Sequence, residues 1–133
     1  MYQFHGWISL RGDANQEKLP VDDQFEKNLE WLKNELLSED VLNEVIELIA
    51  FDNRYVLTLH AHVNRRRIGA VRMAELVSQV AERFRNSKGL IYELDAQSKM
   101  SGGFGIYTVT VVKDGVAFYR LDPFLSPSEL SSN

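Results

Sequence analysis

The sequence predicts a single α+β domain, in which a largely antiparallel sheet carries two amphipathic helices on one face. Two long segments repeat apolar residues with a helical period, and several shorter segments alternate apolar and polar residues as strands do. These segments follow the order β-α-β-β-α-β-β-β, which packs most simply as helices on one side of a sheet. We assign residues 1–123 to this domain and expect the serine-rich tail, residues 124–133, to be disordered.

The first predicted element is a strand over residues 1–11. One of its faces is apolar and holds Tyr2, Phe4, Ile8 and Leu10. The other face is mixed and holds Gln3, His5, Trp7, Ser9 and Arg11. An aromatic residue on the more polar face indicates either a binding partner or a second covering helix, and the strand pattern leaves both open.

The first helix is predicted over residues 21–37, after a polar loop at residues 12–20. Its apolar stripe has the spacing i, i+4, i+8, i+11 and i+15 and comprises Val21, Phe25, Leu29, Leu32 and Leu36. Asp22 and Asp23 lie in the first turn, where carboxylates complement the helix dipole. Trp31 lies off the stripe, so it either packs against a neighbouring segment or stands exposed.

Two strands and a second helix are predicted next. Residues 45–51 are apolar on both faces except for Glu47, which predicts a central strand. Residues 55–63 form the following strand, after a turn at Asp52-Asn53. The second helix is predicted over residues 70–86, and its stripe comprises Met73, Val77, Val80 and Phe84.

The C-terminal part is predicted as a short strand, a loop and a β-hairpin, over residues 90–94, 96–105 and 104–121 in turn. The hairpin is closed by Lys113-Asp114-Gly115. The loop holds Ser101-Gly102-Gly103-Phe104-Gly105, whose glycines are typical of phosphate-binding loops. A strand follows this loop, so no helix N-terminus is available to hold an anion there.

Composition limits the class of protein. A hydrophobic fraction of 44% and a charged fraction of 26% are typical of a globular domain. The absence of cysteine excludes disulfides and thiolate chemistry. No apolar run approaches the ~18 residues that a membrane span needs, and no signal peptide precedes the first strand, so we expect a cytoplasmic protein.

Charge is distributed unevenly along the chain. The net charge is −4, but residues 1–53 hold 12 acids and 4 bases, whereas residues 54–133 hold 7 acids and 11 bases. If the first half forms a coherent face, it would attract a cationic protein and repel nucleic acid. The alternative is that both sets are scattered solvating charges.

The three histidines are the first candidates for a metal or acid–base site. His60 and His62 share one strand face with a spacing that can chelate, and His5 is on a strand that can lie beside them. Metal sites need three or four ligands, and nothing in the spacing selects a carboxylate to complete the set. No nucleophile of matched geometry can be named either, so we expect neither a metal nor catalysis.

Arg65-Arg66-Arg67, with Arg72 close behind, is the strongest local charge run. It could grip phosphates, which keeps a small nucleic-acid-binding module as an alternative. The domain is acidic overall and has no basic stripe to extend such a contact. Pairing with the acidic first half is the competing explanation, and we expect no nucleic-acid partner.

The segment Phe4-His5-Gly6-Trp7-Ile8, followed by a helix with its own Trp31, resembles the bacterial polymorphic-toxin immunity proteins of the immunity protein 7 family, of the contact-dependent growth inhibition type. The similar order of elements runs from Tyr2 to about Pro123. The resemblance implies a small cytoplasmic protein that protects its producer by binding one cognate toxin domain. Only the motif itself carries over, onto His5, Gly6 and Trp7.

We therefore expect a binding protein rather than an enzyme, without cofactor or metal, that neutralises a toxin domain by stoichiometric occlusion. A nuclease toxin would offer a cationic cleft, and an acidic helix face would dock there. The expected contact residues are Trp7, Asp22, Asp23, Glu26, Glu30 and Trp31. His5 and Trp7 can instead be structural, and a His-dependent enzyme is a further alternative.

Overall fold

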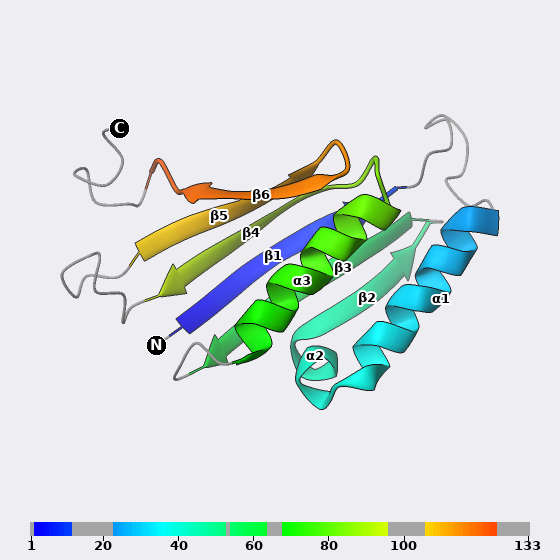
Figure 1. Ribbon diagram of the computed structural model, residues 1–133, viewed down its shortest axis with the longest axis horizontal. Coiled ribbons are helices and arrows are strands. Elements are labelled where there is room, and N and C mark those ends of the chain that lie inside the picture. The colour runs from blue at the N-terminus through cyan, green and yellow to red at the C-terminus, as the bar shows by residue number, and fades with distance from the viewer. Residues whose placement is uncertain (1, 12–22, 53, 64–67, 96–105, 125–133) are drawn as a thin grey trace.

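The computed structural model describes residues 2–11, 23–52, 54–63, 68–95 and 106–124, and six strands form one sheet in this part of the chain. The strands are β1 (Tyr2–Leu10), β2 (Ile46–Phe51), β3 (Arg54–Val63), β4 (Lys88–Asp95), β5 (Ile106–Lys113) and β6 (Val116–Leu121). Their order across the sheet is β2-β3-β1-β4-β5-β6, and every neighbouring pair is antiparallel (Figure 1). The N-terminal strand β1 is therefore central.

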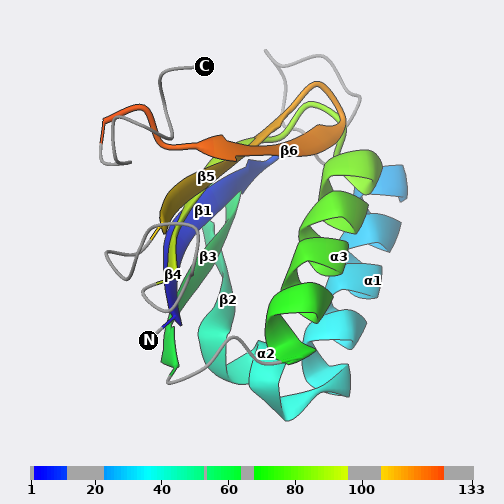
Figure 2. The ribbon, with the colours of Figure 1, turned by 60° about the vertical axis from the view of Figure 1, so that its left-hand side comes forward.

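The helices are α1 (Asp23–Ser38), α2 (Asp40–Val45) and α3 (Ile68–Arg83). Turned by 60°, the molecule shows α1 and α3 together on one side of the sheet (Figure 2). The core lies between these helices and the sheet, and its fully buried large side chains include Ile8, Phe25, Leu32, Leu57, Leu76 and Phe84. The predicted α+β class, with a largely antiparallel sheet and two amphipathic helices on one face, is confirmed.

Two details of the predicted order differ in the structure. The short helix α2 was not predicted, because six residues are too few to show a helical period; its Leu42 is fully buried and anchors it. Strand β2 lies at an edge rather than in the centre. Ile46 faces the core, whereas Glu47 and Ile49 on the other face of the strand are exposed. The strand has apolar residues on both faces, but only one of its faces is buried.

Strands β1 and β4 approach each other closely at two glycines. A Cβ at Gly6 would lie 2.6 Å from the Cα of Ile91 and would also overlap the carbonyl oxygen of Leu90. A Cβ at Gly89 would lie 2.8 Å from the Cα of Ile8. Both positions therefore need glycine, since any larger residue would push the two central strands apart.

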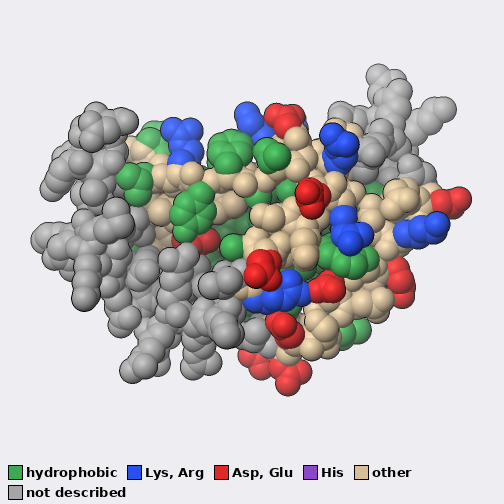
Figure 3. Space-filling view, in the orientation of Figure 1, with side chains coloured by type: hydrophobic (Ala, Val, Ile, Leu, Met, Phe, Trp, Pro, Cys, Tyr) green, Lys and Arg blue, Asp and Glu red, His purple; other side chains and the backbone are tan. Residues whose placement is uncertain are grey.

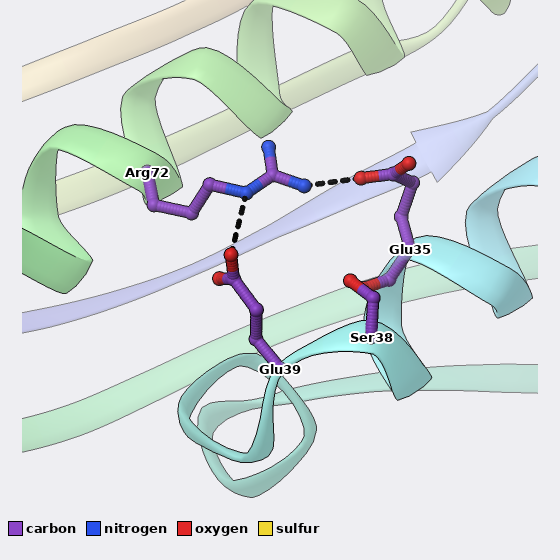
Figure 4. A network of polar contacts seen from close by, with 4 residues as sticks. All are labelled: Glu35, Ser38, Glu39 and Arg72. Carbon is purple, nitrogen blue, oxygen red and sulfur yellow. Dashed lines mark hydrogen bonds and ion pairs between the residues drawn. The ribbon is translucent and has the colours of Figure 1, made fainter.

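Polar contacts join the helices to each other. The buried side chain of Asn28 donates from Nδ2 to the carbonyl oxygen of Arg83 at the end of α3, at 2.9 Å. Arg72 of α3 bridges the carboxylates of Glu35 and Glu39, with Nε 3.5 Å from Glu39 Oε1 (Figure 4). These contacts fix α1 and the start of α2 against α3.

A buried serine ties the end of β1 to the segment before β4. Ser87 is almost fully buried, and its Oγ accepts from the Arg11 backbone N at 2.7 Å. The same hydroxyl lies 3.3 Å from the Arg11 carbonyl oxygen, to which it can donate. The two hydrogen bonds offset the cost of removing this hydroxyl from water and hold the strand end in place.

Candidate functional site

The side of the sheet opposite the helices is called the open face here, because no helix covers it in the described part of the chain (Figure 2). Strand pairing lines up Phe118, Val111, Leu90, Trp7, Thr58 and Glu47 as one row across all six strands. Trp7 lies near the middle of the row with 45% of its surface exposed. Tyr92 on the neighbouring β4 strand is 43% exposed. This face thus presents aromatic side chains to solvent.

All three histidines of the chain gather on the open face. His5 pairs directly with His60 across β1 and β3, and His62 lies two residues further along β3. The Nδ1 atoms of His5 and His60 are 2.8 Å apart, a hydrogen bond in which one ring donates and the other accepts. Burial lowers the pKa of His5 below its ordinary 6.5, and positive charge on His60 or His62 lowers it further.

Acids are concentrated in the segment that forms α1, α2 and β2. From Asp23 to Asp52 the chain holds nine acids and two bases, Lys27 and Lys33. This segment, the acidic edge, comprises α1, α2 and β2. Acidic side chains gather at the end of the molecule where α2 lies (Figure 3). Glu35 and Glu39 of this set are neutralised in part by Arg72.

The predicted contact acids fall within the acidic edge. Asp23, Glu26 and Glu30 are exposed on α1, as expected, while Asp22 lies outside the described residues. Lys27 and Lys33 are also exposed on α1, so the acids do not form an unbroken ridge. Sequence reasoning singled out the first turns of α1, whereas Glu39, Asp40 and Glu44 continue the acidic edge beyond it.

The two tryptophans lie in different places. Trp31 is half-buried between the helices, and the guanidinium carbon of Arg83 lies 4.2 Å above its ring, a cation–π contact. Trp7 points away from the helices onto the open face. The predicted contact residues are thus split between two opposite sides of the sheet.

Comparison with protein-family models matched the chain to Immunity protein 7 over residues 1–130. The chain belongs to the immunity protein 7 family. The same comparisons found no matching curated protein and no matching solved structure. Membership in this family supports the role of an immunity protein and implies a toxin partner. The resemblance drawn from the N-terminal motif is confirmed at the level of the family.

Within this immunity protein the motif His5-Gly6-Trp7 serves two purposes. Gly6 faces the close approach of β4 and is required by the fold. His5 and Trp7 point to the other side of the strand, onto the open face. Because residues of a strand alternate between faces, three consecutive residues divide between the scaffold and the exposed surface.

Several predicted features of the immunity protein fall outside the described residues. These are Arg65-Arg66-Arg67, the loops at residues 12–20 and 96–105, and all of the predicted tail except Phe124. None of the described helices has the length and apolar character needed to cross a membrane.

A hollow of about 180 Å³ lies between α3 and strands β4 to β6, lined mainly by apolar side chains.

Proposed function

We propose that this immunity protein neutralises its cognate toxin by stoichiometric binding, and that the toxin is a nuclease whose cationic cleft is occluded by the acidic edge. The proposal that the partner is a toxin rests on the family match over residues 1–130. The acidic edge supports the charge of that partner, because a nuclease cleft must be positive to hold a phosphate backbone.

The length of α1 gives the acidic edge an extended surface for such a contact. Its 16 residues give a rod about 24 Å long, with Asp23, Glu26 and Glu30 on its exposed side. Complementary charge raises the association rate by steering the two proteins together, and this effect weakens with salt. A stable interface of about 1,600 Å² in total would extend beyond α1 onto α2.

Trp7 is a second candidate contact, on the other side of the sheet. An exposed tryptophan is the residue type that most often anchors an interface. Contact through Trp7 would leave the acidic edge free in the complex. Variants of Trp7 and of the acids on α1 therefore distinguish the two candidate surfaces.

The test is the association rate with the cognate toxin domain, used as a catalytically inactive variant. The double variant Glu26→Lys/Glu30→Lys is expected to slow association about tenfold at low ionic strength and to reduce its dependence on salt. The matched control, Glu75→Lys/Glu82→Lys, makes the same change in net charge with two exposed acids of α3.

The control variant is expected to associate clearly faster than the α1 variant. Equal rates for wild type and the α1 variant would contradict docking through the acidic edge, and a large loss of binding in Trp7→Ala would move the contact to the open face. Absence of any complex between the wild-type protein and the toxin domain would contradict the proposed pairing itself.

A further inference from the structure

The three histidines of the open face come together through strand register. His5 and His60 are direct cross-strand partners, and His62 is diagonal to His5 on the same face. The ring centroids are 4.5 Å apart for His5 and His60, 5.1 Å for His5 and His62, and 5.3 Å for His60 and His62. One ligand-capable nitrogen from each ring lies within 4.8 Å of the others.

These distances are close to those of a metal centre. A tetrahedral Zn²⁺ ion with Zn–N bonds of about 2.0–2.1 Å requires its nitrogens to be roughly 3.3 Å apart. The His5 and His60 nitrogens, at 2.8 Å, would separate slightly on binding, and the His62 nitrogen would approach. Since His60 and His62 are exposed, small side-chain rotations can make this adjustment without disturbing the core.

We propose that His5, His60 and His62 form a three-histidine site for a divalent transition metal, with Zn²⁺ as its first candidate. Imidazole nitrogen suits Zn²⁺, Ni²⁺ and Cu²⁺, whereas Ca²⁺ and Mg²⁺ require oxygen ligands, and among the described residues the cluster contains histidines alone. Three protein ligands leave a fourth tetrahedral position for water.

The backbone beneath the site is well supported. Strand β1 is paired on both sides, by β3 and β4, and β3 is paired by β2 and β1. The ligands therefore come from two strands that are each paired on both sides, rather than from loops, which is the arrangement that holds a site in a fixed geometry. The alternative is that the rings merely share a proton through the His5–His60 hydrogen bond, with no affinity for metal.

The test is isothermal titration calorimetry, in which ZnCl₂ is titrated into the metal-free full chain without toxin. We expect one Zn²⁺ per chain with a Kd of about 1 μM or tighter. Each of the variants His5→Gln, His60→Gln and His62→Gln is expected to weaken Zn²⁺ binding at least about 100-fold. Removing a metal ligand should lower the affinity more than removing a residue that only supports a ligand, which typically costs about 10–100-fold. Circular dichroism confirms that each variant is folded.

The matched control is Glu82→Gln, which removes an exposed carboxylate of α3, on the other side of the sheet, and should leave the Kd unchanged within about twofold. Histidine ring resonances in the NMR spectrum should shift together at one equivalent of Zn²⁺. The absence of saturable binding, binding that survives in all three histidine variants, or its loss in the control would each overturn the proposal. Because no toxin is present, the result is independent of the toxin-binding surface.

Discussion

The two sides of the sheet differ in how their side chains are used. On the helix side, Phe25, Leu32 and Phe84 are fully buried, and charged groups lie on the outer surface of the helices. On the open face, Trp7 and Tyr92 are nearly half exposed and the three histidines face one another. The same strands thus supply the core on one side and an exposed chemical surface on the other, which follows from the alternation of side chains along a strand.

The largest expected effect comes from Gly6, the scaffold residue of the motif. Gly6→Val should destabilise the protein by about 3 kcal/mol or more, because the new side chain meets the backbone of β4. Urea unfolding measures the free energy of unfolding of each variant. The control, Gln3→Val, places the same residue on the open face of the same strand and should cost less than about 1 kcal/mol. Equal losses in the two variants would contradict the division of β1 into two faces.

The next effect concerns the helix side. Asn28→Ala removes the side-chain donor to the Arg83 carbonyl at the end of α3 and should cost about 1–3 kcal/mol. Exposed Asn34 of the same helix offers a control, since Asn34→Ala should change the free energy of unfolding by no more than about 0.5 kcal/mol. If Asn28→Ala were as stable as Asn34→Ala, the contact would not hold α1 against α3.

The open face should contribute less to stability. Trp7→Ala is expected to lower the free energy of unfolding by about 1 kcal/mol, well below the 3–5 kcal/mol typical of a buried tryptophan. Thermal or urea unfolding measures this directly. A loss of about 3 kcal/mol would show that Trp7 belongs to the core and that the open face is covered in the full chain.

The smallest expected effect is a pH dependence on the open face. Burial, with the charge of His60 and His62, lowers the pKa of His5 in the folded chain below its ordinary 6.5. The unfolded chain therefore takes up this proton first as the pH falls, and stability decreases as the pH falls through about 6.5. With EDTA present, Tm should fall between about pH 7.5 and pH 5.5, and fall less in His5→Gln. An equal decrease in Tm in the wild type and in His5→Gln would contradict the lowered pKa of His5.

Much of the fold was predictable because periodicity reports burial directly. The stripe of α1 at Phe25, Leu29, Leu32 and Leu36 is buried as predicted. Met73, Val77 and Val80 of α3 are buried too, and so is Phe84, which directly follows α3. Edge and centre were not predictable for β2, since the partner of a strand is set by tertiary contacts rather than by its own residues. The six residues of α2 were too short for any period to appear.

The candidate sites were predictable only in part. The spacing of His60 and His62 placed them on one face, but only the register of β1 against β3 brings His5 beside them. Charge counting found the acids of α1 but could not show that Trp7 and Glu26 lie on opposite sides of the sheet. Which residues share a surface depends on strand order, which no local pattern records.

The most direct test of the proposed toxin surface is hydroxyl-radical footprinting of the protein alone and in complex with the inactive toxin domain. Each side of the sheet has its own reporter, since Leu37 of α1 is 72% exposed and Trp7 and Tyr92 lie on the open face. Docking through the acidic edge predicts that oxidation of Leu37 falls in the complex while that of Trp7 and Tyr92 is unchanged. Protection of Trp7 and Tyr92 with Leu37 unchanged would contradict it.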